Sequence, residues 1–147
     1  MVRGRDAGHS LVTMRGKQKA MTTQEELIDL TRRMLTAIQS GDYETYRALC
    51  APDLTAFEND VAPYRIDGVD FHTDLIEAAR EQYSHLLRFD MLQPSVQIYG
   101  NAAVVAYTRL LTFAVDVPPT WRSSNETRVF VRFPEGWKMV HFHRTVG

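Results

Sequence analysis

The chain has 147 residues, of which 44% are apolar and 24% charged, with one cysteine and no long hydrophobic run. This composition is typical of one soluble globular domain whose core needs neither disulfides nor a structural metal, and no membrane partner is expected. The net charge of −1 argues against a protein that binds nucleic acid through bulk electrostatics. Because the lone Cys50 cannot form a disulfide within the chain, we expect a reducing, cytoplasmic location.

The charge is unevenly distributed along the chain. Residues 1–20 carry five basic side chains and one acidic one, a net charge of +4, which leaves a net charge of −5 for the rest of the chain. No apolar stretch follows the basic start, which argues against a secretory signal, and Met21 lies directly before the first strong structural signal. We therefore predict a disordered basic leader over residues 1–21 and one domain over residues 22–147, with a functional basic arm as the alternative.

Two helices are predicted at the start of this domain. Thr22 and Thr23 precede Glu25 and Glu26 at the spacing of a capping box, apolar residues then recur at helical intervals, and Ser40-Gly41 supplies the stop. Asp42 predicts the cap of a second, short helix whose apolar side includes Cys50. A core thiol is the favoured interpretation of that cysteine over a nucleophile, because no basic neighbour is aimed at it.

The rest of the chain changes from a helical period to a period of two. A short strand is predicted over 54–58, and a third helical pattern runs from Gly68 to Leu87. Four further strands are predicted over 88–98, 102–115, 125–133 and 137–144. The short turns between these strands predict antiparallel pairing. Helices followed by a meandering sheet are typical of an α+β domain in which N-terminal helices cover one face of a strongly curved antiparallel sheet.

Alternation along the predicted strands places arginines on faces that are otherwise largely apolar. Arg109 shares a face with Tyr107 and Leu111, and Arg144 shares one with Phe142. An arginine in such a place needs an acid, a carbonyl or a bound anion, because an unpaired charge in a dry site is costly.

Two interpretations of these arginines remain open. In the first, they pair with acids such as Glu58 and Glu126 in a buried network, or they simply project beyond the sheet edge. In the second, Arg109, Arg128 and Arg144 on consecutive strands form a receptor that holds a carboxylate or phosphate bidentately.

The opposite face of the last two strands is rich in apolar side chains, too many to leave in contact with water. A second sheet should cover them, and a two-fold homodimer does this most simply. The residues predicted at this interface are Val131, Phe133, Trp137, Met139 and His141. His141 and His143 share this face and could hold a metal together with His72 or His85, but nothing fixes a third ligand, so sheet packing or an interface is favoured and no metal is predicted.

Several separated segments of the chain together resemble a known family. In chain order they are GDYETY (41–46), LTAFE (54–58), DGVDFH (67–72), AYTRL (106–110), ETRVF (126–130) and VHFHR (140–144). Over about residues 25–144 the chain resembles the association, or hub, domain of calcium/calmodulin-dependent protein kinase II. That family is part of the NTF2-like (cystatin-like, SnoaL-like) superfamily, whose cone-shaped fold is shared by nuclear transport factor 2, scytalone dehydratase and ketosteroid isomerase.

The resemblance implies a non-catalytic oligomerisation domain that pairs through its sheet into homodimers or larger closed rings. It also implies a pocket for small carboxylate ligands or an acidic or phosphorylated peptide, and we expect no cofactor. Carried over by motif, the ligand-binding residues are Arg109, Arg128, Arg144, Glu58, His72 and Tyr107. Arg80 stands where the kinase hubs have a bulky pocket-side residue, so ligand identity stays open.

The chemistry that the chain could perform is restricted. It carries no Gly-rich loop, HRD or DFG motif, so it has no kinase activity of its own, and no basic amphipathic segment suits calmodulin. Because the superfamily includes enzymes, the alternative is a small-molecule isomerase, dehydratase or cyclase, with Glu58, Asp60 and His72 as candidates. Arginines around Glu58 would lower its pKa and make it a poor general base, so no catalytic residue is predicted.

Overall fold

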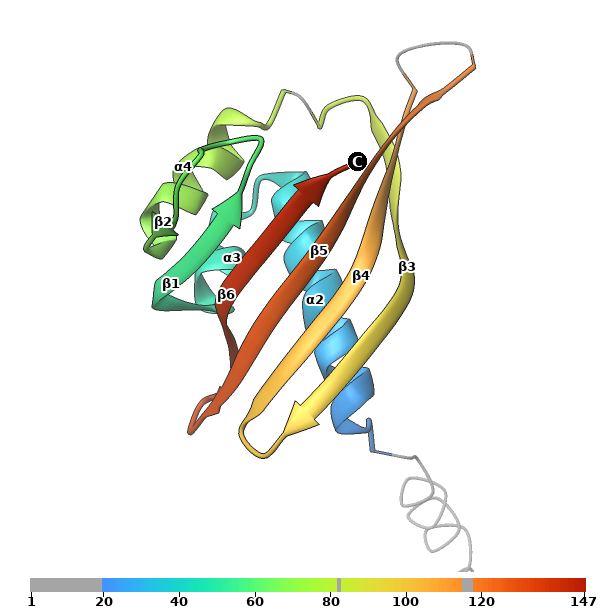
Figure 1. Cartoon of the computed structure of the whole chain (residues 1–147). Helices are drawn as coiled ribbons and strands as arrows, with labels where there is room; N and C mark the ends of the chain where they lie inside the picture. Colours follow the sequence, from blue (N-terminus) through green and yellow to red (C-terminus); the bar gives the residue numbers. More distant parts are fainter. Residues whose placement is uncertain (1–19, 82, 115–117) are drawn as a thin grey trace, which may run out of the picture.

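The computed structural model describes residues 20–147 except Gln82 and 115–117, and residues 1–19 of the predicted leader lie outside the described residues. The helices and strands follow one another along the chain as shown in Figure 1. In order they are α2 (Thr23–Ser40), α3 (Tyr43–Ala48), β1 (Cys50–Glu58), β2 (Ile66–Asp67), α4 (Val69–Ala78), β3 (Leu86–Tyr99), β4 (Ala102–Phe113), β5 (Thr120–Phe133) and β6 (Gly136–Val146).

The predicted caps of the first two helices are confirmed. The Thr22 hydroxyl accepts a hydrogen bond from the backbone N–H of Glu25 at 3.2 Å, and the Glu25 carboxylate accepts one from the N–H of Thr22 at 3.2 Å. Gly41 ends α2 in the left-handed conformation with a φ of 72°, which glycine adopts without steric cost. Asp42 then caps α3 by accepting from the N–H of Thr45 at 3.2 Å. Local sequence therefore sets where both helices begin.

The sheet has six strands in the order β2-β1-β6-β5-β4-β3. The strands from β3 to β6 pair antiparallel with their neighbours along the chain, as predicted from their short turns. β1, however, runs parallel to β6, so the sheet is mixed rather than antiparallel throughout. Parallel neighbours need a long connection, and residues 59–135 lie between these two strands. No short turn could therefore reveal their pairing.

Several predicted boundaries are wrong. β1 begins at Cys50 and not at residue 54, and β5 begins at Thr120 and not at residue 125. α4 ends at Ala78, and the apolar pattern that continues to Leu87 includes the start of β3 instead of one long helix. Cys50 opens β1 and does not lie in a helix, although it is buried as predicted. Pro52 disfavours helical backbone at Ala51, the residue before it, so α3 has to end upstream of that position.

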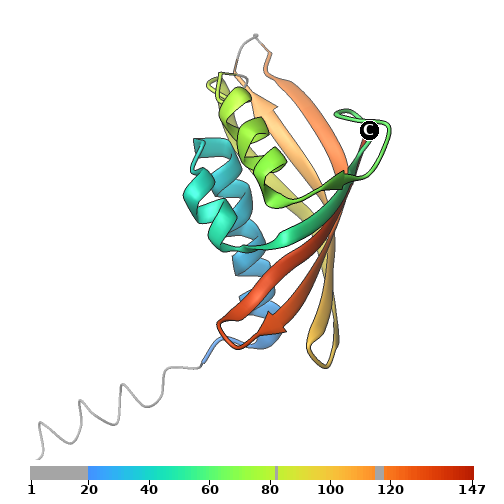
Figure 2. The same cartoon turned by 90° about the vertical axis from the view of Figure 1, so that its left-hand side faces the viewer.

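The described helices α2, α3 and α4 lie on one side of the sheet, as the side view in Figure 2 shows. The core fills the space between them. Its fully buried side chains include Leu27, Met34, Leu35, Leu54, Val105, Phe130 and Met139. Burying each large apolar side chain stabilises the fold by roughly 1.5–3 kcal/mol. The opposite, outer face of the sheet is covered by no helix of the described residues.

Strict alternation fails in β6, where a β-bulge changes the face of the strand. Val129 of β5 pairs with His141, but the next residue, Phe130, pairs with Met139, so Val140 is an extra residue. A bulge of this kind reverses which side chains point inward on the two sides of it. Both Met139 and Phe142 consequently face the helices and are buried.

This bulge corrects part of the predicted interface. Trp137 and Met139 were expected on the outer face, but both are buried in the core of the chain and are unavailable to a partner. The other three predicted residues, Val131, Phe133 and His141, are only half-buried in the chain. His141 packs on the outer side of β1, where its Nδ1 lies 2.8 Å from the Thr55 hydroxyl.

Candidate functional site

A cavity of about 390 Å³ lies between the helices and the inner face of the sheet. Five of the six ligand-binding residues predicted from the sequence line it: Glu58, His72, Arg109, Arg128 and Arg144. Tyr107 does not, because it lies behind Arg128 and Glu126 and is buried. Apolar walls come from α4 and β4, including Leu75, Ile76 and Leu111. The cavity thus joins a charged floor to apolar walls.

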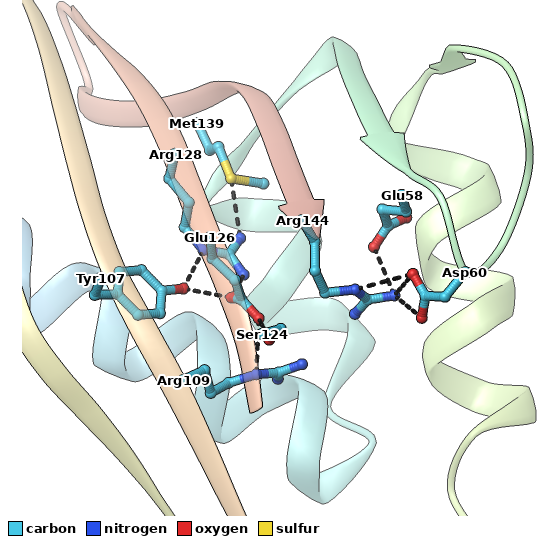
Figure 3. A network of polar contacts seen from close by, with 9 residues as sticks. All are labelled: Glu58, Asp60, Tyr107, Arg109, Ser124, Glu126, Arg128, Met139 and Arg144. Carbon is cyan, nitrogen blue, oxygen red and sulfur yellow. Dashed lines mark hydrogen bonds and ion pairs between the residues drawn. The ribbon is translucent and has the colours of Figure 1, made fainter. Parts of the chain in front are cut away.

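The first charged cluster is centred on Glu126 and is drawn in Figure 3. Its Oε2 lies 2.8 Å from Arg109 Nε and accepts a hydrogen bond from the Ser124 hydroxyl at 2.7 Å. Its Oε1 accepts from the Tyr107 hydroxyl at 2.6 Å and from Arg128 Nη2 at 3.3 Å. Strand register places these side chains together, since Tyr107 pairs with Glu126 and Arg109 with Ser124 across β4 and β5.

Arg128 is fully occupied inside this cluster. Its Nε donates to the Tyr107 hydroxyl at 2.8 Å, its Nη1 lies 3.1 Å from the Met139 sulfur, and its guanidinium stacks over the Phe142 ring at 4.0 Å. Burial opposes its charge, but Tyr107 and Glu126 outweigh this effect and raise the pKa of Arg128. Each guanidinium nitrogen of Arg128 has a partner within the chain, so the main role of this side chain is structural.

The second cluster is centred on Arg144. Its Nη2 lies 3.3 Å from Glu58 Oε1 and 2.9 Å from Asp60 Oδ2, and its Nε donates to Asp60 Oδ1 at 3.3 Å. Glu58 Oε2 also lies 3.1 Å from His72 Nε2. The parallel pairing of β1 with β6 sets Glu58 directly opposite Arg144, and Asp60 follows in the next turn. This cluster therefore depends on a contact between the two halves of the chain.

The buried carboxyls of the two clusters are held in their charged forms. Burial raises the pKa of Glu58, but His72 and Arg144 together outweigh it and hold the pKa below its usual 4.5. Burial likewise raises the pKa of Glu126, and Arg109 and Arg128 outweigh it. A general base for isomerase chemistry needs a pKa tuned toward neutrality, so this shift counts against Glu58 in that role.

Arg109 differs from the other two arginines. It is buried and lines the cavity, yet its terminal nitrogens donate no hydrogen bond to any described residue. Its Nε is within ion-pair distance of Glu126 but lacks hydrogen-bond alignment. In Figure 3 its guanidinium extends away from Tyr107. Arg122 also lines the cavity, with its guanidinium 5.3 Å from the Phe113 ring centroid.

Both sequence interpretations of the arginines contain part of the arrangement. The buried network with Glu58 and Glu126 exists, and all three arginines also line one cavity. Alternation placed Glu126 and Arg128 on one face but left their shared role open. The sequence indicates Asp60 only as a candidate base, because a turn residue has no periodic pattern that would reveal an arginine partner.

Other candidates do not join this site. Arg80 does not line the cavity and packs at the end of α2, where its Nε would lie 2.9 Å from a Cβ at Gly41. Burial raises the pKa of the Cys50 thiol to about 12, which disfavours a thiolate nucleophile. Within residues 20–147, gaps aside, no three His, Cys, Asp or Glu side chains gather as a metal site. No helix in the described part of the chain is long and apolar enough to cross a membrane.

Two solved structures of other proteins superpose on this chain and share its fold. The hub of S. rosetta CaMKII superposes with a TM-score of 0.79 at 28% identity, covering 88% of this chain and all of that one. An NTF2-like protein with a cystatin-like fold from Novosphingobium aromaticivorans superposes with a TM-score of 0.73 at 19% identity, covering 98% of this chain and 92% of that one. The second similarity shows the fold alone.

Sequence comparison identifies the family. The chain is 37% identical over 125 residues to the delta subunit of rabbit (Oryctolagus cuniculus) calcium/calmodulin-dependent protein kinase type II. The match covers 83% of this chain but only 23% of that kinase subunit. The family model of the calcium/calmodulin dependent protein kinase II association domain matches residues 23–146. The chain therefore belongs to the calcium/calmodulin-dependent protein kinase II association domain family, with an α+β, NTF2-like fold.

Proposed function

We propose that this chain is a non-catalytic self-association domain that also binds a small carboxylate or acidic group in its cavity. The observation that carries the binding part is Arg109, a buried cation whose terminal nitrogens adjoin the cavity without a hydrogen-bond partner among the described residues. A guanidinium in that state favours an anion, and a carboxylate matches its planar fork.

The charge balance of the cavity favours a monoanion. Four arginines line it, and three carboxylates answer them: Glu58, Asp60 and Glu126. Among these arginines and carboxylates, one positive charge is left over. The apolar walls around Leu75 and Leu111 favour a short apolar chain or ring attached to the acid.

Support for self-association comes from the outer face of the sheet. Its centre is formed by half-buried apolar side chains, with Val104 opposite Val129 across β4 and β5. Phe57 at the edge of this face is 44% exposed. A second copy packed sheet to sheet would bury this surface, and the relatives are themselves described as association domains and hubs.

The binding part is tested by thermal unfolding in the presence of sodium butyrate or phenylacetate. Either acid should raise the melting temperature of the wild type, and Arg109→Met should abolish the shift. Arg88→Met removes an exposed arginine that pairs with Asp90, and this variant should keep the same shift of the melting temperature. Because Arg109→Met also disturbs Glu126, Ala79→Phe provides a second variant that narrows the cavity without touching an ion pair. A wild type that responds to neither acid would refute the carboxylate site.

The assembly part is tested by light scattering. A carboxylate at the centre of the outer face cannot be desolvated without a partner, so Val129→Asp should convert oligomers to monomers. Gln24→Asp places the same charge at an exposed position in the first turn of α2 and should leave the oligomer unchanged. A monomeric wild type at micromolar concentration would overturn the assembly proposal.

A further inference from the structure

The three carboxylates that pair with the arginines of the cavity differ in how easily they can move away from those arginines. The side chains of Glu126 and Glu58 are 0% and 5% exposed, whereas that of Asp60 is 38% exposed. If either glutamate moved away, a buried arginine would lose its charged partner, which is strongly unfavourable. Asp60 can turn into solvent, where water replaces Arg144 as its partner.

The backbone explains why Asp60 reaches Arg144. A tight turn follows β1, in which the N–H groups of Val61 and Ala62 donate to the carbonyl of Glu58 at 2.9 and 3.0 Å. This turn brings the short Asp60 side chain back over the end of β6. Its two oxygens then bind Nη2 and Nε of Arg144 at 2.9 and 3.3 Å. These contacts are the bidentate pairing that a guanidinium makes with a free carboxylate.

We propose that Asp60 is an internal competitor at the cavity: it occupies the edge of Arg144 that a ligand carboxylate would take, and binding of such a ligand displaces it. This proposal rests on the proposed carboxylate site. It extends that site by assigning two arginines different states. Arg109 is open to a ligand, and Arg144 becomes available only when Asp60 turns away.

Competition by Asp60 predicts how the affinity for a ligand depends on this carboxylate and on the charge of the ligand. Removing the Asp60 carboxylate frees Arg144 and leaves one more uncompensated positive charge in the cavity. Arg144 can then donate charge-assisted hydrogen bonds to the ligand carboxylate. Asp60→Asn should therefore bind a monocarboxylate about tenfold more tightly than the wild type. A dicarboxylate gains more, because the cavity then holds two positive charges in excess.

Calorimetric titration of the full chain with sodium butyrate and with succinate tests the proposal. The expected result is a Kd for butyrate about tenfold lower in Asp60→Asn and a larger drop for succinate. Asp60→Glu, which keeps a carboxylate in reach, should remain close to the wild type. Asp67→Asn removes an exposed aspartate that pairs with Arg65 and should change nothing. Asp60→Ser repeats the test with a second residue that suits a turn.

Combination with Arg144→Met shows whether Asp60 acts through that arginine. In this background Asp60→Asn should have no further effect on the Kd. A gain that persists without Arg144, or an equal gain in Asp67→Asn, would refute the competitor. An unchanged Kd in both Asp60→Asn and Asp60→Ser would also refute it while leaving the carboxylate site standing. Absence of binding in the wild type and in both Asp60 variants would instead overturn the carboxylate site itself.

Discussion

Two ion-pair clusters share one cavity, and they differ in depth. The Glu126 cluster joins neighbouring strands of the antiparallel meander and excludes water almost completely. The Arg144 cluster joins the last strand to β1 and to the turn after it, and Asp60 leaves it partly open to solvent. A fully buried network must stay intact to avoid unpaired charges, whereas a partly exposed one can exchange partners. We therefore expect the Glu126 cluster to contribute to stability and the Arg144 cluster to be the adjustable part of the proposed carboxylate site.

The largest expected effect comes from breaking the buried cluster. Glu126→Gln removes the charge that two arginines share and should lower the free energy of unfolding by about 3–5 kcal/mol. Urea unfolding followed by circular dichroism measures this loss. Glu44→Gln on the exposed side of α3 serves as the matched control. A loss as small as that of the control would show that the Glu126 cluster contributes little to stability.

A smaller effect is expected at the boundary of the second cluster. Glu58→Gln keeps a hydrogen-bonding group beside His72, and Arg144 retains Asp60, so the free energy of unfolding should fall by about 1–3 kcal/mol. The same urea titration measures it. A loss equal to that of Glu126→Gln would remove the distinction between the clusters.

The pH dependence of stability should reflect both buried carboxyls. Each has a lower pKa in the folded chain than its usual 4.5, so the unfolded chain takes up protons first as the pH falls. Their contribution is present above pH 4.5 and is lost as the pH falls through the lower folded values. Melting temperatures measured between pH 7 and pH 3 should therefore drop most steeply below about 4.5. Glu126→Gln should flatten this drop, and an unchanged profile would contradict its assigned charge.

The smallest effect on stability is expected at the exposed side of the second cluster. Asp60→Asn should change the free energy of unfolding by less than about 1 kcal/mol, because partly exposed ion pairs contribute little. Its effect should instead lie in ligand affinity. Urea unfolding of the ligand-free variant checks this, and a loss of several kcal/mol would make Asp60 a structural residue.

The arginines of the site were predictable from the amino-acid sequence, but the pairing of each arginine with its acid was not. Both missed pairings have one cause. The resemblance and the strand alternation together named Arg109, Arg128 and Arg144, and the structure brings these side chains around one cavity. The partners that decide their states were less accessible. Glu126 was one of several possible acids, and Asp60 was weighed as a base instead of as the partner of Arg144. Which acid meets which arginine depends on register between distant strands.

The outer face of the sheet shows the same limit. Alternation correctly placed Val129 and Val131 on one side of β5, but it carried Trp137 and Met139 to the wrong side of β6. A single extra residue at Val140 reverses the strand, and its side chain has no feature that marks a bulge. Only the packing of Met139 against Arg128 and the core reveals it.

The amino-acid sequence by itself determined the features that rest on local interactions. These are the capping box at Thr22, the stop at Gly41, the antiparallel order from β3 to β6 and the family. Tertiary structure decided the parallel pairing of β1 with β6, the bulge at Val140 and which nitrogens of each arginine pair with an acid. Those features depend on contacts between residues far apart in the chain, such as Thr55 and His141, which are 86 positions apart, and no local pattern encodes them.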